Sequence, residues 1–190
     1  MGSCDLSRDL LFDCEYKPVK GAENSIVVLE KENIDTLTFN ESNKLIIEAL
    51  TQVATTRAYS YIGNGNPINP SKSLISDEQG VRWMESIPFT IEGNTPEIKN
   101  ELNRLAGKPL LIICENYYQG DATGKSVYEV YGVKSPVYLE SCEDAEGNMR
   151  WMCVFKNKDR YESPTPPHNI FLTSLTVSKA IVDALLVASS

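Results

Sequence analysis

The sequence predicts a mainly β (α+β) fold, a β-sandwich or small β-barrel with one packed α-helix. Most apolar segments are short, β-branched and alternating, one segment has a clear helical period, and Gly-, Asn- and Pro-rich stretches separate them. The 190 residues, 42% hydrophobic, suit one domain with a buried core. We expect an extended N-terminal arm over 1–24, the β domain over 25–161, and a Pro-rich linker with an extended, apolar C-terminal arm over 162–190.

Five strands are expected before the helix, over 25–30, 37–39, 44–50, 57–62 and 80–91. The third suits a strand or a helix, and its β-branched centre favours the strand. Gly, Asn and Pro dominate 63–71, which is therefore a loop, and a loop of this length usually contacts something. Pro88 indicates an edge position or a bulge in the fifth strand.

The helix is expected over about 95–106. Thr95 can cap its start, and Pro96 suits the first helical position. Gly107 is placed to end it. One apolar stripe would face the sheet, formed by Ile98, Leu102 and Leu105.

Four more strands are expected after the helix, over 110–118, 126–133, 137–142 and 149–156, with a turn over 143–148. The Pro-rich residues 162–167 cannot continue a sheet core and are expected to form a stiff, extended linker. The apolar tail can form a helix from about Ser178. Its apolar face must then dock on its own domain or on a partner.

Residues 120–126 read GDATGKS, one residue short of the phosphate-binding pattern G-x-x-x-x-G-K-[ST]. Gly124 and Lys125 fit its end, but the first glycine should stand where Gln119 does. A phosphate loop also needs a helix behind it to present N–H groups, whereas the residues after Ser126 alternate like a strand. We therefore expect a β-hairpin here and no nucleotide site.

The sequence does not predict an enzyme. His168 is the single histidine and is expected at a surface position of the linker, which leaves no Ser-His-Asp or Cys-His site. Five cysteines without a C-x-x-C pair predict no zinc site. The carboxylates of Asp77-Glu78 and Glu143-Asp144 suit solvated turns. No catalytic residue, cofactor or metal ion is predicted.

Two sets of side chains on the expected strands bear on function, one of carboxylates and one of aromatic residues. Glu115 and Glu129 are expected on facing hairpin strands, pointing outward or toward a channel. The aromatic residues of the strands suit the core and subunit contacts, and a stacking platform for sugar or single-stranded nucleic acid is the second possibility.

The charge of the chain bears on its partners. A net charge of −8 disfavours a general duplex-DNA binder, which needs basic surface to contact phosphates. It is compatible with a surface that DNA must pass without sticking. Unpaired thiols suit a reducing cytoplasm, and we expect neither a signal peptide nor a membrane span.

The order of short motifs resembles β-barrel tail proteins of tailed bacteriophages that infect Bacteroides-like gut bacteria. The resemblance covers about residues 1–164 and rests on order and spacing. Its first part is a Cys-containing lead, a D-C pair, a glycine and an I-x-V-x-L-like strand, here Cys4–Leu6, Asp13-Cys14, Gly21 and Ile26–Leu29. Its second part starts with a helix start at Thr95–Glu97, a strand of branched residues at Leu110–Cys114 and a polar hairpin at Gly120–Lys125. A glycine at Gly132, a D-x-x-G turn at Asp144–Gly147 and a final acidic residue with a proline at Glu162–Pro164 complete it.

The resemblance implies a tail tube or tail ring (connector) protein of the virion, assembled in the cytoplasm of the bacterial host. It implies a homo-oligomeric ring, a hexamer or a dodecamer, whose sheets line a channel for passage of double-stranded DNA during genome ejection. Neighbouring tail or portal-proximal rings would be its other partners. We expect contacts between rings at the loop over 63–71, at Asn64, Asn66, Ile68 and Asn69, and at the two arms.

Two other classes remain open. One is a carbohydrate- or protein-binding β-sandwich module of a baseplate or fibre, which exposed aromatic residues on one face would favour. The other is an enzyme, which a pocket holding several carboxylates would favour.

Overall fold

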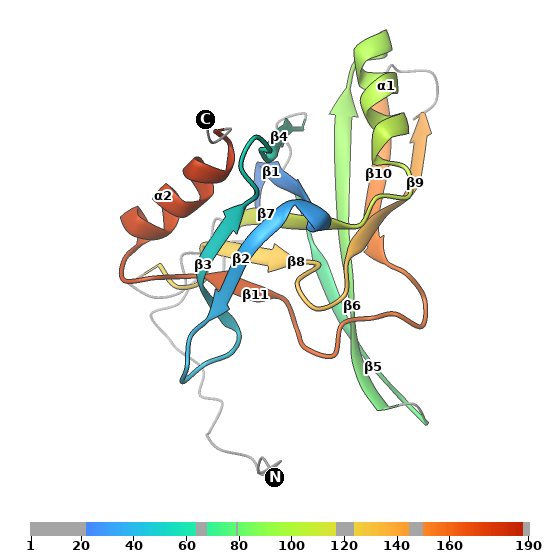
Figure 1. The fold of residues 1–190 in the computed structure, drawn as a ribbon. Helices are drawn as coiled ribbons and strands as arrows, with labels where there is room; N and C mark the ends of the chain where they lie inside the picture. Colours follow the sequence, from blue (N-terminus) through green and yellow to red (C-terminus); the bar gives the residue numbers. More distant parts are fainter. Residues whose placement is uncertain (1–21, 64–67, 79, 117–123, 145–149, 188–190) are drawn as a thin grey trace, which may run out of the picture.

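Alternation of apolar and polar residues produces a fold dominated by strands in the computed structural model (Figure 1). The structure describes residues 22–63, 68–78, 80–116, 124–144 and 150–187. Its elements are β1 (Ala22–Glu30), β2 (Ile34–Phe39), β3 (Ile46–Gln52), β4 (Tyr59–Ile62), β5 (Ser71–Asp77), β6 (Gly80–Glu92), α1 (Pro96–Leu105), β7 (Leu110–Asn116), β8 (Tyr128–Tyr131), β9 (Val137–Asp144), β10 (Arg150–Asn157), β11 (His168–Ile170) and α2 (Leu175–Leu185). A 3-10 turn at Lys31–Asn33 joins β1 to β2.

The strands form one open, mixed sheet in the order β2-β3-β11-β8-β7-β9-β10-β6-β5. β1 pairs with β7 and carries β4 on its other side. Nearly all neighbours are antiparallel, and the exception is the parallel pair β11 and β3. The mainly β prediction is therefore confirmed, but the expectation of a sandwich or a barrel is wrong, because this sheet is single and open.

Strand β7 organises the core because its two faces pack in two different apolar clusters. Leu110 and Ile112 face the first cluster, whereas Leu111 and Ile113 face the second. The first cluster joins β1 and β7 to β6, β10 and helix α1. Its central members are Ile26, Ile87, Phe89, Leu102, Cys153 and Phe155. The second cluster lies under helix α2, which contributes Val182 and Leu185.

Helix α1 matches its sequence prediction at both ends. Thr95 is the N-cap, and its side chain accepts a hydrogen bond from the Ile98 N–H. Leu102 and Leu105 are buried on the face toward the sheet. The chain leaves the helix through Gly107, whose φ of +78° suits a residue without a Cβ.

The C-terminal segment is the main correction to the predicted domain plan. Residues 162–190 were expected as a linker and an arm, but β11 is inserted between β3 and β8 inside the sheet. Helix α2 begins at Leu175, three residues before the expected start, and Ser174 caps it. The apolar face of the tail therefore docks on its own domain rather than on a partner.

Strand β5 is an element that the sequence did not predict. It pairs along its whole length with the first half of β6, so that the two form a hairpin that projects from the body (Figure 1). Its register with β6 ends at the pair Ser71 and Ser86. Beyond Ser86, β10 is the partner of β6, and Pro88 lies there opposite Val154. Among the described strands, Pro88 thus occupies an edge, as its sequence indicates.

Candidate functional site

The two ends of the sheet are the first candidate for a functional surface. β2 and β5 lie at the two ends of the main path of the sheet, with β3 and β6 as their described neighbours, and β4 is a third edge strand that pairs with β1. Of the seven residues of β5, six are exposed. Two apolar side chains of the hairpin are open to solvent, Leu74 at 56% exposure and Val81 at 57%. An edge of this kind is a template for pairing with another chain.

The backbone of β5 is oriented for such pairing at Leu74. Its cross-strand partner is Trp83. Trp83 exchanges both of its backbone hydrogen bonds with Ser163 on its other side, at 2.7 and 2.9 Å. In an antiparallel pair only every second residue pair is hydrogen-bonded, so Leu74 and Trp83 form a non-hydrogen-bonded pair. The N–H and C=O of Leu74 therefore point outward, toward the free edge.

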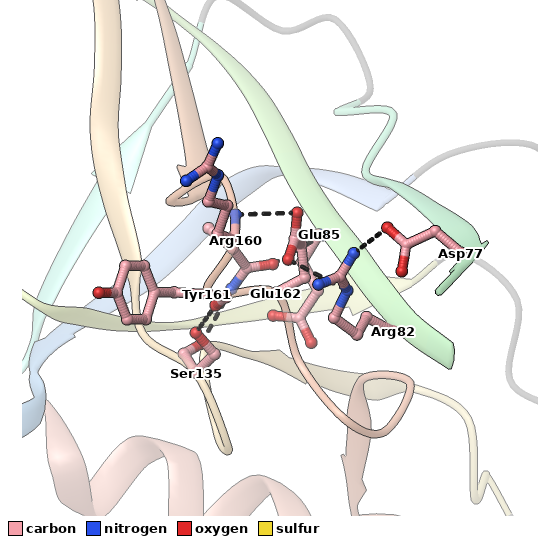
Figure 2. A network of polar contacts seen from close by, with 8 residues as sticks. Asp77, Arg82, Glu85, Ser135, Arg160, Tyr161 and Glu162 are labelled. Carbon is pink, nitrogen blue, oxygen red and sulfur yellow. Dashed lines mark hydrogen bonds and ion pairs between the residues drawn. The ribbon is translucent and has the colours of Figure 1, made fainter. Parts of the chain in front are cut away.

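A polar network lies at the end of the hairpin nearest its turn (Figure 2). The Arg82 guanidinium forms an ion pair with Asp77 across the hairpin and lies 3.5 Å from Glu162 on the following segment. The Ser135 hydroxyl donates to the Tyr161 carbonyl, and the Arg160 N–H donates to the Glu162 carboxylate at 3.1 Å. Because the side chain of Glu162 is only 6% exposed, its ion pair with Arg82 is shielded from solvent and links the hairpin to the segment after β10.

A buried carboxylate lies at the other end of the hairpin, where β6 enters the body of the sheet. Glu85 is 1% exposed, and the Gly132 N–H donates to its carboxylate at 2.7 Å. Asn157 accepts a hydrogen bond from the Glu85 N–H at 2.8 Å and donates to the Ser135 carbonyl at 2.9 Å. The Lys31 ammonium donates to the Gly132 carbonyl at 2.9 Å. The network joins β6, β10 and the turn after β8 by polar contacts rather than apolar packing.

A second buried carboxylate ties the start of β5 to the centre of the sheet. Glu129 was expected to point outward or into a channel, but the side chain is buried. It forms an ion pair with Lys72 of β5 and accepts a hydrogen bond from the Tyr131 hydroxyl at 2.6 Å. The outward and channel-facing expectations for Glu129 are therefore wrong. The residue anchors the hairpin instead.

Glu85 predicts a specific pH dependence of stability. Burial raises its pKa to about 7, against the hydrogen bonds from Gly132 and Asn157 that lower it. A glutamate in the unfolded chain titrates near about 4.3, so between these values the native state holds a proton that the unfolded state has released. The free energy of unfolding then falls as pH rises through this window. We expect Glu85→Gln to remove this fall, roughly 3 kcal/mol in the wild-type minus variant difference.

The measurement is urea unfolding of both proteins from pH 4.5 to 7.5. The wild-type minus variant difference in the free energy of unfolding is compared, because His168 also titrates in this window. Burial lowers the pKa of His168 to about 4, which makes stability rise with pH over part of the same window. That contribution is present in both proteins and cancels. A difference that stays constant with pH would contradict a proton held on Glu85.

The loop over 63–71 is only partly described. Asn64 and Asn66 lie outside the described residues. Ile68 is 5% exposed and belongs to the first core cluster, so its side chain is not available for a contact between rings. Asn69 is exposed, and its side chain or backbone already takes part in an interaction. Of the predicted contact residues, Asn69 is thus the one that the structure places on the surface.

The GDATGKS stretch does not have the surroundings of a phosphate loop. Strand β8, not a helix, follows Ser126, and β7 and β8 pair antiparallel. The predicted hairpin is confirmed, although 117–123 lie outside the described residues. Gly124 has a φ of +76°, and a Cβ there would lie 3.1 Å from Leu175 of α2. The glycine therefore serves packing of the helix.

His168 does not occupy the surface position expected of it. It begins β11 and is 1% exposed, with Phe39 at a ring distance of 5.3 Å. Neither ring nitrogen has a hydrogen-bond partner, and the low pKa keeps the ring neutral. The residue is a core side chain in this fold. Among the described residues, no group of three His, Cys, Asp or Glu side chains could hold a metal ion.

Two neighbouring hollows lie between α1 and strand β4. The Tyr61 hydroxyl donates to Glu101 at 2.6 Å and takes part in the walls of both. One, of about 230 Å³, has aromatic and charged walls that include Tyr59, Arg104 and Lys108. The other, of about 170 Å³, has mainly apolar walls. Sequence reasoning grouped these tyrosines with the other strand aromatics and did not identify the hollows, which form only when α1 packs beside β4.

Neither a protein family nor a curated protein nor a solved structure matches the chain. Among the described residues, no helix is long and apolar enough to span a membrane.

Proposed function

We propose that this chain is a virion structural protein that assembles into rings of a phage tail tube or tail connector and lines a channel for genome passage. The observation that carries the proposal is the open sheet whose main path ends in two different strands, β2 and β5, each unpaired on its outer side among the described strands. The β5 end projects on a hairpin and exposes Leu74 and Val81. The resemblance of residues 1–164 to tail proteins supports the same reading.

The geometry of the two ends favours a closed ring. If the outward N–H and C=O groups of β5 pair with β2 of the next copy, the contact joins two different surfaces. Such a heterologous contact generates a ring when the rotation closes and a filament when it does not. A contact of β5 with a second β5 would give a dimer instead. The ring requires the β5–β2 contact, and continuous sheet pairing across subunits would then line the channel.

The net negative charge of the chain suits a channel through which DNA passes. With a net charge of −8 per subunit, a ring of six or twelve copies is strongly negative as a whole. A field of that sign repels phosphates and favours passage of the duplex without binding. For contacts with the next ring, the exposed Asn69 remains a candidate. The C-terminal helix is excluded from that role because its apolar face packs on its own domain.

Light scattering over a concentration series tests this function. We expect a discrete species whose mass is a multiple of the 21.2 kDa chain mass, and we expect this mass to stop increasing with concentration once the ring has closed. A dimer as the largest species would indicate β5–β5 pairing and contradict the ring. Growth without a limit would indicate either an open filament or rings stacked into a tube, and a central hole in electron micrographs would identify the tube.

A binding module of a baseplate or fibre is the second candidate function, because the hollow beside α1 has the groups that sugars contact. Tyr59 is 45% exposed and carries the Arg57 guanidinium over its ring at 5.0 Å. Arg104 and Lys108, which form ion pairs with Glu101 and Glu30, provide donors. Saturable binding of an oligosaccharide to a monomeric chain, lost in Tyr59→Ala, would favour this candidate over the ring.

A further inference from the structure

Two cysteines face each other across neighbouring strands of the sheet. Cys142 of β9 and Cys153 of β10 are direct cross-strand partners in an antiparallel pair. Their Sγ atoms are 2.7 Å apart. The Cα atoms of directly opposed residues in such a pair lie about 4.5 to 5.5 Å apart, which is within the range of disulfide-bonded cysteines. The backbone therefore already has the separation that a disulfide requires.

The surroundings distinguish this pair from the remaining thiols of the described chain. Cys153 is 1% exposed and lies in the first core cluster, whereas Cys142 is half-buried at its margin. Cys114 is fully buried in β7 and has neither of these cysteines as its cross-strand partner. The half-buried thiol of Cys142 can thus react with a small reagent from solvent. The thiol of Cys153, on the core side, is then placed to attack the sulfur of Cys142.

We propose that Cys142 and Cys153 are a modification site that closes to an intramolecular disulfide when the protein meets a small-molecule disulfide such as oxidised glutathione. The Cys142 thiolate attacks one sulfur of that reagent, which forms a mixed disulfide and releases one glutathione thiolate. The Cys153 thiolate then attacks the Cys142 sulfur and releases the second. The protein thiols lose two electrons and two protons, and the reagent becomes two molecules of reduced glutathione.

The buried thiol of Cys153 limits the rate of the second step. Burial raises the pKa of Cys153, and the contact with Cys142 adds to this effect, so the second attack requires brief opening at this part of the sheet. Closure is therefore slow and becomes faster as pH rises. In a reducing cytoplasm the pair stays as thiols. Outside it, the disulfide fixes the register of β9 against β10, whether or not the chain assembles into rings.

The test uses the full chain. The reduced protein is incubated with oxidised glutathione, its remaining thiols are blocked in acid, and the chain is digested and analysed by mass spectrometry. We expect one cross-linked peptide pair, Cys142 with Cys153, in chains that remain monomeric on a non-reducing denaturing gel. We also expect a melting temperature several degrees higher than that of the reduced protein, with reversal by a dithiol reductant.

Matched variants separate the proposal from other thiol chemistry. Cys142→Ser is the main variant, because the half-buried site tolerates a hydroxyl better than the core does, and it should lose the cross-link and the gain in melting temperature. Cys114→Ser should retain the cross-link if it folds, and Cys4→Ser with Cys14→Ser provides a second control that leaves the described residues unchanged. The proposal is overturned if both thiols are fully blocked after oxidation. A stable glutathione adduct on Cys142, or cross-links that use Cys4 or Cys14 instead, would also overturn it.

Discussion

Leu74→Pro is expected to abolish assembly while leaving the monomer folded. The Leu74 N–H points away from β6, because Trp83 uses its own backbone groups to bond Ser163. Proline removes that outward donor without breaking the ladder between β5 and β6, and edge strands tolerate it in this position. The ring of proline also obstructs an approaching strand. Losing a hydrogen bond weakens each contact by about tenfold or more. Because every contact of a closed ring carries this loss, we expect no ring at concentrations where the wild type assembles.

Leu74→Ala is the matched control, because it removes the exposed apolar side chain and keeps the N–H. We expect the alanine variant to assemble at moderately higher concentration and the proline variant to remain monomeric by light scattering. The melting temperatures of both monomers should stay close to that of the wild type, since substitutions at exposed positions cost about 0.5 kcal/mol or less. Normal assembly of a folded Leu74→Pro protein would show that the β5 edge is not the interface.

Gly132→Ala is expected to have the largest effect on stability. Gly132 has a φ of +86°, and a Cβ there would lie 2.5 Å from the Leu110 carbonyl oxygen. The three atoms nearest to that Cβ, from Leu110, Leu111 and Val137, are all backbone atoms, so none can turn aside as a side chain could. The same residue donates its N–H to Glu85 and accepts from Lys31, so a shift of its backbone would disturb the buried polar network as well. We expect a loss of about 3 kcal/mol or more in the free energy of unfolding.

The control for this variant is Gly107→Ala. Gly107 has a similar φ of +78°, but a Cβ there meets no atom within 4 Å. Its substitution carries the cost of the left-handed conformation alone, about 1 to 2 kcal/mol. Urea unfolding of the two variants should therefore separate conformational strain from steric overlap. Equal losses in the two proteins would mean that the backbone around Gly132 relaxes freely and that the polar network does not hold it.

The sequence predicts those elements whose signals are local. Helix α1 has a cap, a proline at its start, an apolar stripe and a terminal glycine, and each of these acts within a few residues. The hairpin of β7 and β8 is equally local. Strand β5 was missed because Ser, Lys and Asp occupy most of a strand that is exposed on both faces. Such a strand has neither an alternating pattern nor a continuous apolar run.

The rest of the fold depends on contacts between residues far apart in the chain. The Pro-rich stretch before His168 correctly indicated irregular backbone, but the three residues that follow are too few to identify a central strand. Its place is set by pairing with β3 and β8. Free edges cannot be recognised before the order of strands is known, so the candidate interface could not be located from sequence.

The sequence contains a signal that Glu85 is buried. Val81, Trp83, Ile87 and Phe89 share one phase of the alternation in β6, and Glu85 occupies that same phase. A carboxylate at a position where the pattern predicts an apolar side chain indicates a buried polar contact. The identity of its partners, Gly132 and Asn157, required the tertiary structure.

The decisive measurement is electron microscopy of the purified full chain in negative stain, at the concentration where light scattering reaches its limiting mass. We predict rings with a central hole and one rotational symmetry. In Leu74→Pro these particles should be absent. Solid globular particles without a channel, at that limiting mass, would contradict the proposed ring and leave the binding module as the better explanation of this fold.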